Sequence, residues 1–262
     1  MKKILTVFLL SLFAFGCKSE NKEKELIVQE ENENLIEAEA DSTVDIEPIS
    51  HASMILTLGD DVIYIDPTGG AEAYQGEEDP DFVLITDIHG DHLDEKTLSS
   101  LNLENAKIIA PQAVKDQLSD SISKMVTVMA NGENLEEQNF SIEAIPMYNL
   151  REEAKQFHPK GRGNGYILEA DGQRIYIAGD TEDIPEMRAL KDIDVAFIPM
   201  NLPYTMPVEK AAEAVLEFEP KKVYPYHYRG TEGLADIDKY KQLVQEGNKD
   251  IEVLELEWYP QE

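Results

Sequence analysis

Cysteine and basic residues are both scarce in this chain of 262 residues. Cys17 is the only cysteine, which excludes a framework of internal disulfides. Lysine and arginine number 23 against 53 aspartates and glutamates, for a formal net charge of −30. Because nucleic acids and anionic lipids are bound by basic faces, this balance argues against either as a direct partner of the bare domain. A serine-hydrolase nucleophile elbow and a phosphate-binding glycine loop are also missing, which removes two competing chemistries.

Long apolar runs are equally scarce. The run over residues 4–15 is too short to cross a bilayer, and the lysines before it are typical of a signal peptide. A lone cysteine directly after that run predicts a bacterial lipoprotein, cleaved and lipidated at Cys17. Secretion as a soluble protein is the alternative, because residues 14–16 lack the leucine that usually opens such a cleavage site. We therefore expect an exported protein whose only membrane contact is a lipid anchor, in the periplasm or on the cell surface.

Composition divides the chain into three parts. Residues 1–17 are the predicted signal peptide. Residues 18–44 are rich in acidic and poor in apolar side chains, so they cannot bury enough surface to offset chain entropy and are expected to be a disordered tether. Residues 45–262 have a normal length for one α/β domain with a sizeable core. The sequence does not indicate an oligomeric state.

Residues 45–262 alternate between strand and helix patterns in two comparable halves, which predicts a four-layer αββα sandwich. A long loop over residues 146–164 interrupts this alternation, and its length suggests a functional role. The predicted strands cover residues 52–58, 62–65, 82–86, 107–110, 125–129, 140–145, 165–169, 174–178, 195–199, 223–227 and 251–256, and the predicted helices cover residues 94–101, 184–190, 207–217 and 236–245.

The strongest chemical signal lies at the end of the strand over residues 82–86. In an extended segment alternate side chains share one face, so Asp87 and His89, which follow this strand, can point at one metal ion. Gly90 then permits a bend in the backbone that aims Asp91 and His92 at a second ion. Imidazole and carboxylate are ligands of Zn, Mn and Fe, and this cluster contains both: Asp87, His89, Asp91 and His92.

Taken alone, such a cluster is also compatible with surface decoration. Two later strands favour a metal site over surface decoration, because each ends at a further potential ligand. Asp180 follows the strand over residues 174–178, and His227 ends the strand over residues 223–227. Three strand ends, far apart in the sequence, thus carry metal ligands. This convergence predicts the binuclear metal site of a hydrolase.

The order D-x-H-x-D-H, then G-D-T, then a strand-terminal histidine resembles the metallo-β-lactamase superfamily. Within it the chain is most similar to the lactonase-like branch typified by L-ascorbate-6-phosphate lactonase. Residues 49–54, 63–67, 157–161 and 179–187 support the resemblance, which covers about residues 45–262. It implies the αββα fold and two divalent ions, Zn or Mn first and Fe or Mg as alternatives.

The resemblance also implies a ligand set, with two departures. The family motif begins with histidine where this chain has Asp87, and Asn149 falls where the family often has a further histidine. The first site would then be Asp87, His89 and Asn149, and the second Asp91, His92, His227 and a bridging Asp180. Because the first site loses imidazoles, we expect it to be loosened and to shift from Zn towards Mn, Fe or Mg.

Several other side chains have open roles. His158 could replace Asn149 as a ligand, act as a proton donor or substrate contact, or simply pack beneath its loop. His51 is either close to the site or a hydrogen-bonded core histidine. Asp66 could orient a ligating imidazole or cap its turn. For catalysis, Asp91 is expected to orient the nucleophile or accept its proton, with His158 as a second catalytic candidate.

Basic side chains form two local islands in this acidic chain. Lys160 and Arg162 lie in the first, and Arg229 lies in the second. They are expected to recognise an anionic group of the substrate, phosphate or carboxylate; the alternative is that they balance nearby acids.

The combined prediction is a hydrolase that attacks a small anionic lactone or ester with a metal-bound hydroxide. A phosphodiester hydrolase on the same fold is one alternative. A non-catalytic metal-binding lipoprotein with a degenerate first site is another. Redox use of an iron site is disfavoured, because the sequence shows no partner domain for electron transfer.

Overall fold

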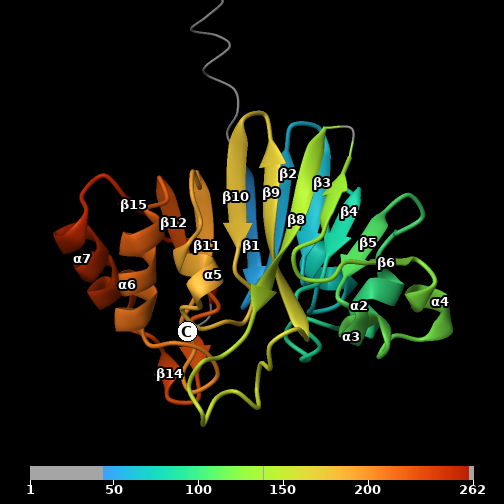
Figure 1. Cartoon of the computed structure of the whole chain (residues 1–262). Coiled ribbons are helices and arrows are strands. Elements are labelled where there is room, and N and C mark those ends of the chain that lie inside the picture. The colour runs from blue at the N-terminus through green and yellow to red at the C-terminus, as the bar shows by residue number, and fades with distance from the viewer. Residues whose placement is uncertain (1–43, 138, 260–262) are drawn as a thin grey trace, which may run out of the picture. The chain divides into compact units, whose positions relative to one another are not determined.

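Two β-sheets stack face to face between two layers of helices in the computed structural model of this chain (Figure 1). The structure describes residues 44–137 and 139–259. The predicted signal peptide, Cys17 and nearly all of the predicted tether lie outside the described residues. In the described part of the chain, no helix has the length and apolar character needed to cross a membrane.

The first sheet is built from the N-terminal half of the domain. Gly59, with a φ of 60°, turns β2 back along β3 and confirms the predicted hairpin. From β3 onwards neighbouring strands run parallel, because helices connect them. Its six strands lie in chain order: β1 (Asp45–Ser50), β2 (Ser53–Leu58), β3 (Asp61–Ile65), β4 (Phe82–Leu84), β5 (Lys107–Ala110) and β6 (Val126–Val128).

The second sheet comes from the C-terminal half. Asp171 and Gly172 both have positive φ and form the tight turn of the β9–β10 hairpin, as predicted. Beyond β10 the strands run parallel. Its seven strands lie in the order β15 (Glu252–Val253), β12 (Lys222–Tyr226), β11 (Val195–Pro199), β10 (Gln173–Ile177), β9 (Gly163–Ala170), β8 (Phe140–Met147) and β7 (Asn134–Glu136).

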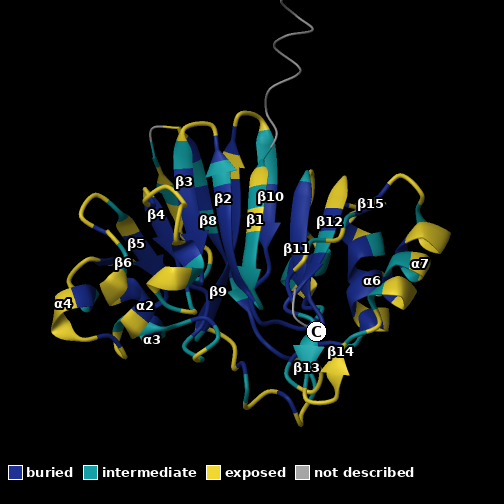
Figure 2. Ribbon diagram, turned by 180° about the vertical axis from the view of Figure 1, so that it is seen from behind, coloured by how far each residue is buried: buried dark blue, intermediate teal, exposed yellow. Residues whose placement is uncertain are grey.

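Helices cover the outer face of each sheet (Figures 1 and 2). Asp94 caps α2 by accepting a hydrogen bond from the backbone NH of Lys96, as its sequence position predicts. Beside the first sheet lie the helices η1 (Ala71–Tyr74), α2 (Glu95–Ser100), α3 (Gln112–Lys115) and α4 (Asp120–Ser123), and beside the second lie α5 (Pro185–Arg188), α6 (Val208–Phe218) and α7 (Ile237–Gly247). A two-stranded ribbon, β13 (Arg229–Gly230) and β14 (Gly233–Leu234), follows β12.

Three apolar cores separate the four layers. Along β3, Ile63 and Ile65 face the core between the sheets, whereas Val62 and Tyr64 face the core beneath the first helix layer. The second sheet alternates in the same way, and its outer face packs on α5, α6 and α7. Three cores between four layers are the αββα sandwich that the sequence predicted.

The polar motifs all follow strands that end at one edge of this sandwich. Strands β3 and β4 run parallel in the first sheet, and β10, β11 and β12 run parallel in the second. In Figure 1 the arrows of β1 and β10 point to the lower edge, where the connecting loops gather. Ligand sites of α/β sheets form at the carboxyl ends of the strands, and this edge carries the candidate site.

Candidate metal centre

All five histidines of the chain gather at this edge. The rings of His89 and His158 lie 5.1 Å apart, and those of His92 and His227 also lie 5.1 Å apart. His51 completes the group, with its ring 5.5 Å from that of His227. Since the chain holds only these five histidines, the fold concentrates every imidazole in one place.

A buried cluster, called here the second cluster, consists of Asp91, His92 and His227. One ligand atom from each lies within 4.8 Å of the others. Nε2 of His227 is 3.3 Å from Oδ2 of Asp91. His92 and His227 are buried and Asp91 is partly exposed, so the cluster opens towards solvent through its carboxylate.

Asp66 orients His92, as the sequence suggested. Its Oδ2 lies 2.8 Å from Nδ1 of His92, and the backbone NH and hydroxyl of Thr86 donate to the same carboxylate at 2.7 and 2.6 Å. With the Nδ1 proton held by Asp66, Nε2 is the ring nitrogen that faces the cluster. That Nε2 atom is buried and has no hydrogen-bond partner among the described residues.

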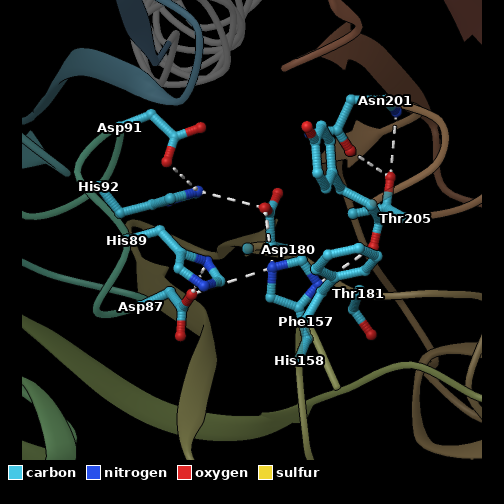
Figure 3. A network of polar contacts seen from close by, with 12 residues as sticks. Asp87, His89, Asp91, His92, Phe157, His158, Asp180, Thr181, Asn201 and Thr205 are labelled. Atoms are coloured by element: carbon cyan, nitrogen blue, oxygen red, sulfur yellow. Dashed lines mark hydrogen bonds and ion pairs between the residues drawn. The ribbon is translucent and has the colours of Figure 1, made fainter. Parts of the chain in front are cut away.

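Asp180 lies between the two groups of histidines (Figure 3). Its carboxylate oxygens are 3.4 Å from Nε2 of His92, 3.1 Å from Nε2 of His158 and 3.3 Å from Nε2 of His227. Gly179 makes this position possible, because its φ is 66° and a Cβ there would lie 2.6 Å from Sδ of Met147. Asp180 is thus placed where it could bridge two ions, and its bridging role stays a prediction.

The first cluster consists of Asp87, His89 and His158, again with one ligand atom from each within 4.8 Å of the others. Nδ1 of His158 is 3.1 Å from the carbonyl oxygen of Tyr204, which leaves Nε2 to face Asp180. This Nε2 atom is also buried without a hydrogen-bond partner in the described part of the chain. Of the roles left open for His158, the geometry favours that of a ligand.

Asn149 lies beside His158. Its amide nitrogen donates to the carbonyl oxygens of Ala154 and Tyr204, at 2.9 and 2.6 Å, and lies 3.1 Å from Nδ1 of His158. The amide nitrogen therefore braces the loop that carries His158. The amide oxygen of Asn149 is buried without a hydrogen-bond partner among the described residues, so its expected role as a ligand stays a prediction beside that of His158.

Two of the three predicted anion-binding side chains are engaged elsewhere. Arg162 donates from Nε and Nη2 to the two oxygens of Asp87, at 3.0 and 2.9 Å. Lys160 donates to Glu186 at 2.7 Å and lies over the ring of Tyr148. The alternative that these basic side chains balance nearby acids is the one the structure supports.

Arg229 and His51 lie beside the second cluster. The guanidinium of Arg229 sits 4.4 Å from the ring centre of Tyr259, whose hydroxyl is 3.3 Å from Nδ1 of His51. Partial burial, followed by the nearby His227 and Arg229, lowers the pKa of His51. His51 is thus a neutral, half-buried imidazole next to a candidate ligand, and both side chains remain candidates for contact with substrate.

Three residues of this edge adopt left-handed backbone conformations that favour glycine. The φ angles are 51° for His51, 45° for Asp66 and 44° for His227. Each follows directly on a strand, so the strained turn re-aims its side chain towards the cluster. Strain of this kind is concentrated at functional sites.

Sequence reasoning missed the loop after β11. Asn201 places its amide nitrogen 3.4 Å from the ring nitrogens of His227, and the hydroxyl of Thr205 donates to the amide oxygen of Asn201. Both are buried, and both appear in Figure 3. A signal was present: β11 lies between the parallel strands β10 and β12, so the residues after it had to reach the same edge.

The side chains of this edge fit a divalent ion. Burial would raise the pKa of Asp180, but the imidazoles of His227, His92 and His158 outweigh burial and hold that pKa well below its usual value. Oδ1 of Asp180 is a buried atom without a hydrogen-bond partner within the described residues, as are the two Nε2 atoms named above. Buried polar atoms normally have hydrogen-bond partners, so two imidazole nitrogens and one carboxylate oxygen that lack them and lie next to one another form a donor set that fits a cation.

Known proteins are similar to this chain in sequence and in fold. A family model described as the β-lactamase superfamily domain matches residues 45–227. A metal-dependent hydrolase of Pyrococcus abyssi is 31% identical over 211 residues, covering 77% of this chain and 92% of its own length. A solved structure from Parabacteroides distasonis, described as a metal-dependent hydrolase, is 41% identical with a TM-score of 0.74, and the match covers 82% of this chain and 94% of that one.

Two further solved structures extend the comparison. Igni18, a metallo hydrolase of Ignicoccus hospitalis, is 25% identical with a TM-score of 0.68 over 81% of this chain and 94% of its own. CmlA, a diiron β-hydroxylase of Streptomyces venezuelae, is 18% identical with a TM-score of 0.60 over 83% of this chain and 54% of its own, and shares the fold alone. The narrower lactonase-like branch stays a prediction. The chain belongs to the metallo-β-lactamase superfamily, which confirms the family and the class of enzyme that the sequence predicted.

Proposed function

We propose that this protein is a metal-dependent hydrolase of a small lactone or other ester-type substrate. The observation that carries the proposal is the convergence of the Nε2 atoms of His92, His158 and His227 on the carboxylate of Asp180. Membership of the superfamily and the metal-dependent hydrolases among its relatives support the same reaction class. The first cluster would hold one divalent ion and the second another, with Asp180 shared between them.

When bound, divalent ions would acidify a water molecule and polarise the carbonyl oxygen of the substrate. Asp91 is the residue placed to receive a proton. Burial would raise its pKa, but His227 and His92 outweigh burial and hold the pKa well below its usual value, so this carboxylate is ionised at neutral pH. It is also partly exposed and can meet an incoming water.

Asp66, Asn149 and Asn201 serve the reaction indirectly. Each contacts an imidazole of the edge and fixes its orientation without facing the substrate itself. His158 was also a catalytic candidate. Its Nε2 atom faces Asp180, which favours the role of a metal ligand instead.

Arg229 is the basic candidate that lies beside the second cluster. Lys160 and Arg162 are held by Glu186 and Asp87. Arg229, stacked on Tyr259 beside His51, lies at the edge of the second cluster and could pair with a carboxylate or phosphate of the substrate.

The test is a substrate screen with the full-length protein loaded with Zn²⁺ or Mn²⁺. Lactones, phosphodiesters and amides are assayed with the wild type and with a His92→Ala control. We expect lactone turnover that the control lowers at least ~1,000-fold, since a ligand is removed. Turnover of phosphodiesters alone would replace the substrate class, and metal binding without any turnover would reduce the protein to a metal binder.

The proposal includes attachment to a membrane through lipid on Cys17. Incorporation of radiolabelled palmitate in a bacterial host, lost in a Cys17→Ser variant, is the expected result. Unlabelled protein recovered from the medium would favour secretion instead.

A further inference from the structure

Arg162 stands against the first cluster as a permanent cation. We propose that Arg162 is a positioning residue that competes with a metal ion for Asp87, so that the first cluster binds its divalent ion more weakly than the second cluster does. The inference rests on the proposed function only in assuming that the two clusters bind metal.

The contacts of Asp87 show the competition directly. Nε and Nη2 of Arg162 donate to the two carboxylate oxygens, and Nδ1 of His89 lies 2.7 Å from Oδ2. Nη2 of Arg162 also donates to the carbonyl oxygen of Phe157, which anchors the guanidinium. Both oxygens that could face an ion already have a partner, and so does one ring nitrogen of His89.

The ion pair between Asp87 and Arg162 is largely buried. The side chain of Asp87 is 0% exposed and that of Arg162 is 17% exposed. A buried carboxylate needs a cation, and the planar guanidinium supplies one with matched geometry. A divalent ion must therefore share Asp87 with Arg162 or displace it, and it meets the repulsion of a neighbouring positive charge.

The second cluster has a different backing. His92 rests on the carboxylate of Asp66, and His227 rests on the amide of Asn201. Asp66 adds negative charge behind its ligand, whereas Arg162 adds positive charge behind Asp87. Two clusters with the same number of ligands should then differ in affinity, and the first should fill only at higher metal concentration.

The experiment is a metal titration of full-length, metal-free protein with MnCl₂ and ZnCl₂ against a chelator of known affinity. Bound metal is counted by elemental analysis, and parallel Co²⁺ titrations are followed by visible absorption. For the wild type we expect one tight ion and a second at least ~10-fold weaker. In Arg162→Gln the weak ion should tighten ~10-fold or more, because the buried carboxylate regains its need for a cation.

Two further variants separate charge from structure. Arg162→Lys keeps the charge and should stay close to the wild type. Arg188→Gln is the matched control, because Arg188 forms a comparable ion pair with Asp183 away from the clusters, and it should change neither ion.

Several results would overturn the inference. Equal affinity for both ions in the wild type would overturn it. This measurement needs no variant, so the inference can be tested even if Arg162→Gln does not fold. A weaker second ion in Arg162→Gln would show that Arg162 supports metal binding. If neither the wild type nor any variant binds an ion, the proposed function itself fails. If the tight ion is lost only in His92→Ala, the proposed function stands.

Discussion

The two ligand clusters carry three side chains each, yet they differ in what stands behind those side chains. The second cluster is backed by the Asp66 carboxylate and the Asn201 amide, and its two imidazoles are buried. The first is backed by the Arg162 guanidinium, and the side chain of His89 is 39% exposed. A count of ligands is therefore a poor guide to metal affinity, because the partners of those ligands set their charge and orientation.

Replacing Asp180 should affect the two clusters alike, because Asp180 faces histidines of both clusters. Asp180→Asn keeps the shape and removes the charge. We expect both metal affinities to fall by more than ~100-fold, measured by chelator competition. The matched control is Asp183→Asn, at a partly buried ion pair with Arg188. Loss at one cluster alone would contradict the shared position of Asp180.

Asp66→Asn should act on the second cluster alone. Asparagine tolerates the left-handed backbone of this position, so the fold is expected to persist. Without the carboxylate, the Nδ1 proton of His92 is held less firmly, and we expect a ~10–100-fold loss of affinity for the tight ion. Asp94→Asn, which preserves a helix cap, serves as control. An unchanged tight ion would show that Asp66 does not support the ligand.

Metal binding should also depend on pH. Burial would lower the pKa of His92, but Asp180 and Asp66 outweigh burial and raise it well above 6.5 in the metal-free protein. Metal must displace that proton, so affinity for the tight ion should rise ~10-fold per pH unit until the raised pKa is passed. Calorimetry in buffers of different ionisation enthalpy would detect the released proton. Binding without proton release would contradict this.

The same pKa has a consequence for the stability of the metal-free protein. Since the folded pKa of His92 is raised, its ion pairs stabilise the fold fully below about pH 6.5 and lose that effect as pH rises through the raised pKa. Denaturant unfolding of the metal-free protein at several pH values measures this loss.

Lys160→Gln should have the smallest effect. Lys160 is paired with Glu186 at the surface rather than with a ligand. We expect metal affinity to be unchanged and KM for any substrate to stay within about twofold. A KM that rose for anionic substrates alone would restore Lys160 as an anion-binding side chain.

Strand ends were the part of this site that the sequence predicted best. Apolar runs located β4, β10 and β12, and each is followed within three residues by its predicted ligand: Asp87, Asp180 and His227. Parallel strands deliver their carboxyl ends to one edge, so a local pattern was enough to infer a distant meeting.

Loop residues were predicted less well. Residues 148–162 connect β8 to β9, and nothing in their local pattern says which side chain returns to the site. The orientation of His158 depends on the carbonyl oxygen of Tyr204, 46 residues further along the chain from His158. The pairing of Arg162 with Asp87 spans 75 residues and was equally invisible.

The placement of the second cluster has one more consequence. Asp91 and His92 come from the first half of the domain and His227 from the second, so one bound ion would fasten distant stretches of chain to each other. Because the unfolded chain does not hold these residues together, the ion binds the folded state selectively and thereby stabilises it. Because the chain has a single cysteine, no internal disulfide can replace this link. Removal of the ion by a chelator should then speed digestion by proteases as well as stop the proposed hydrolysis.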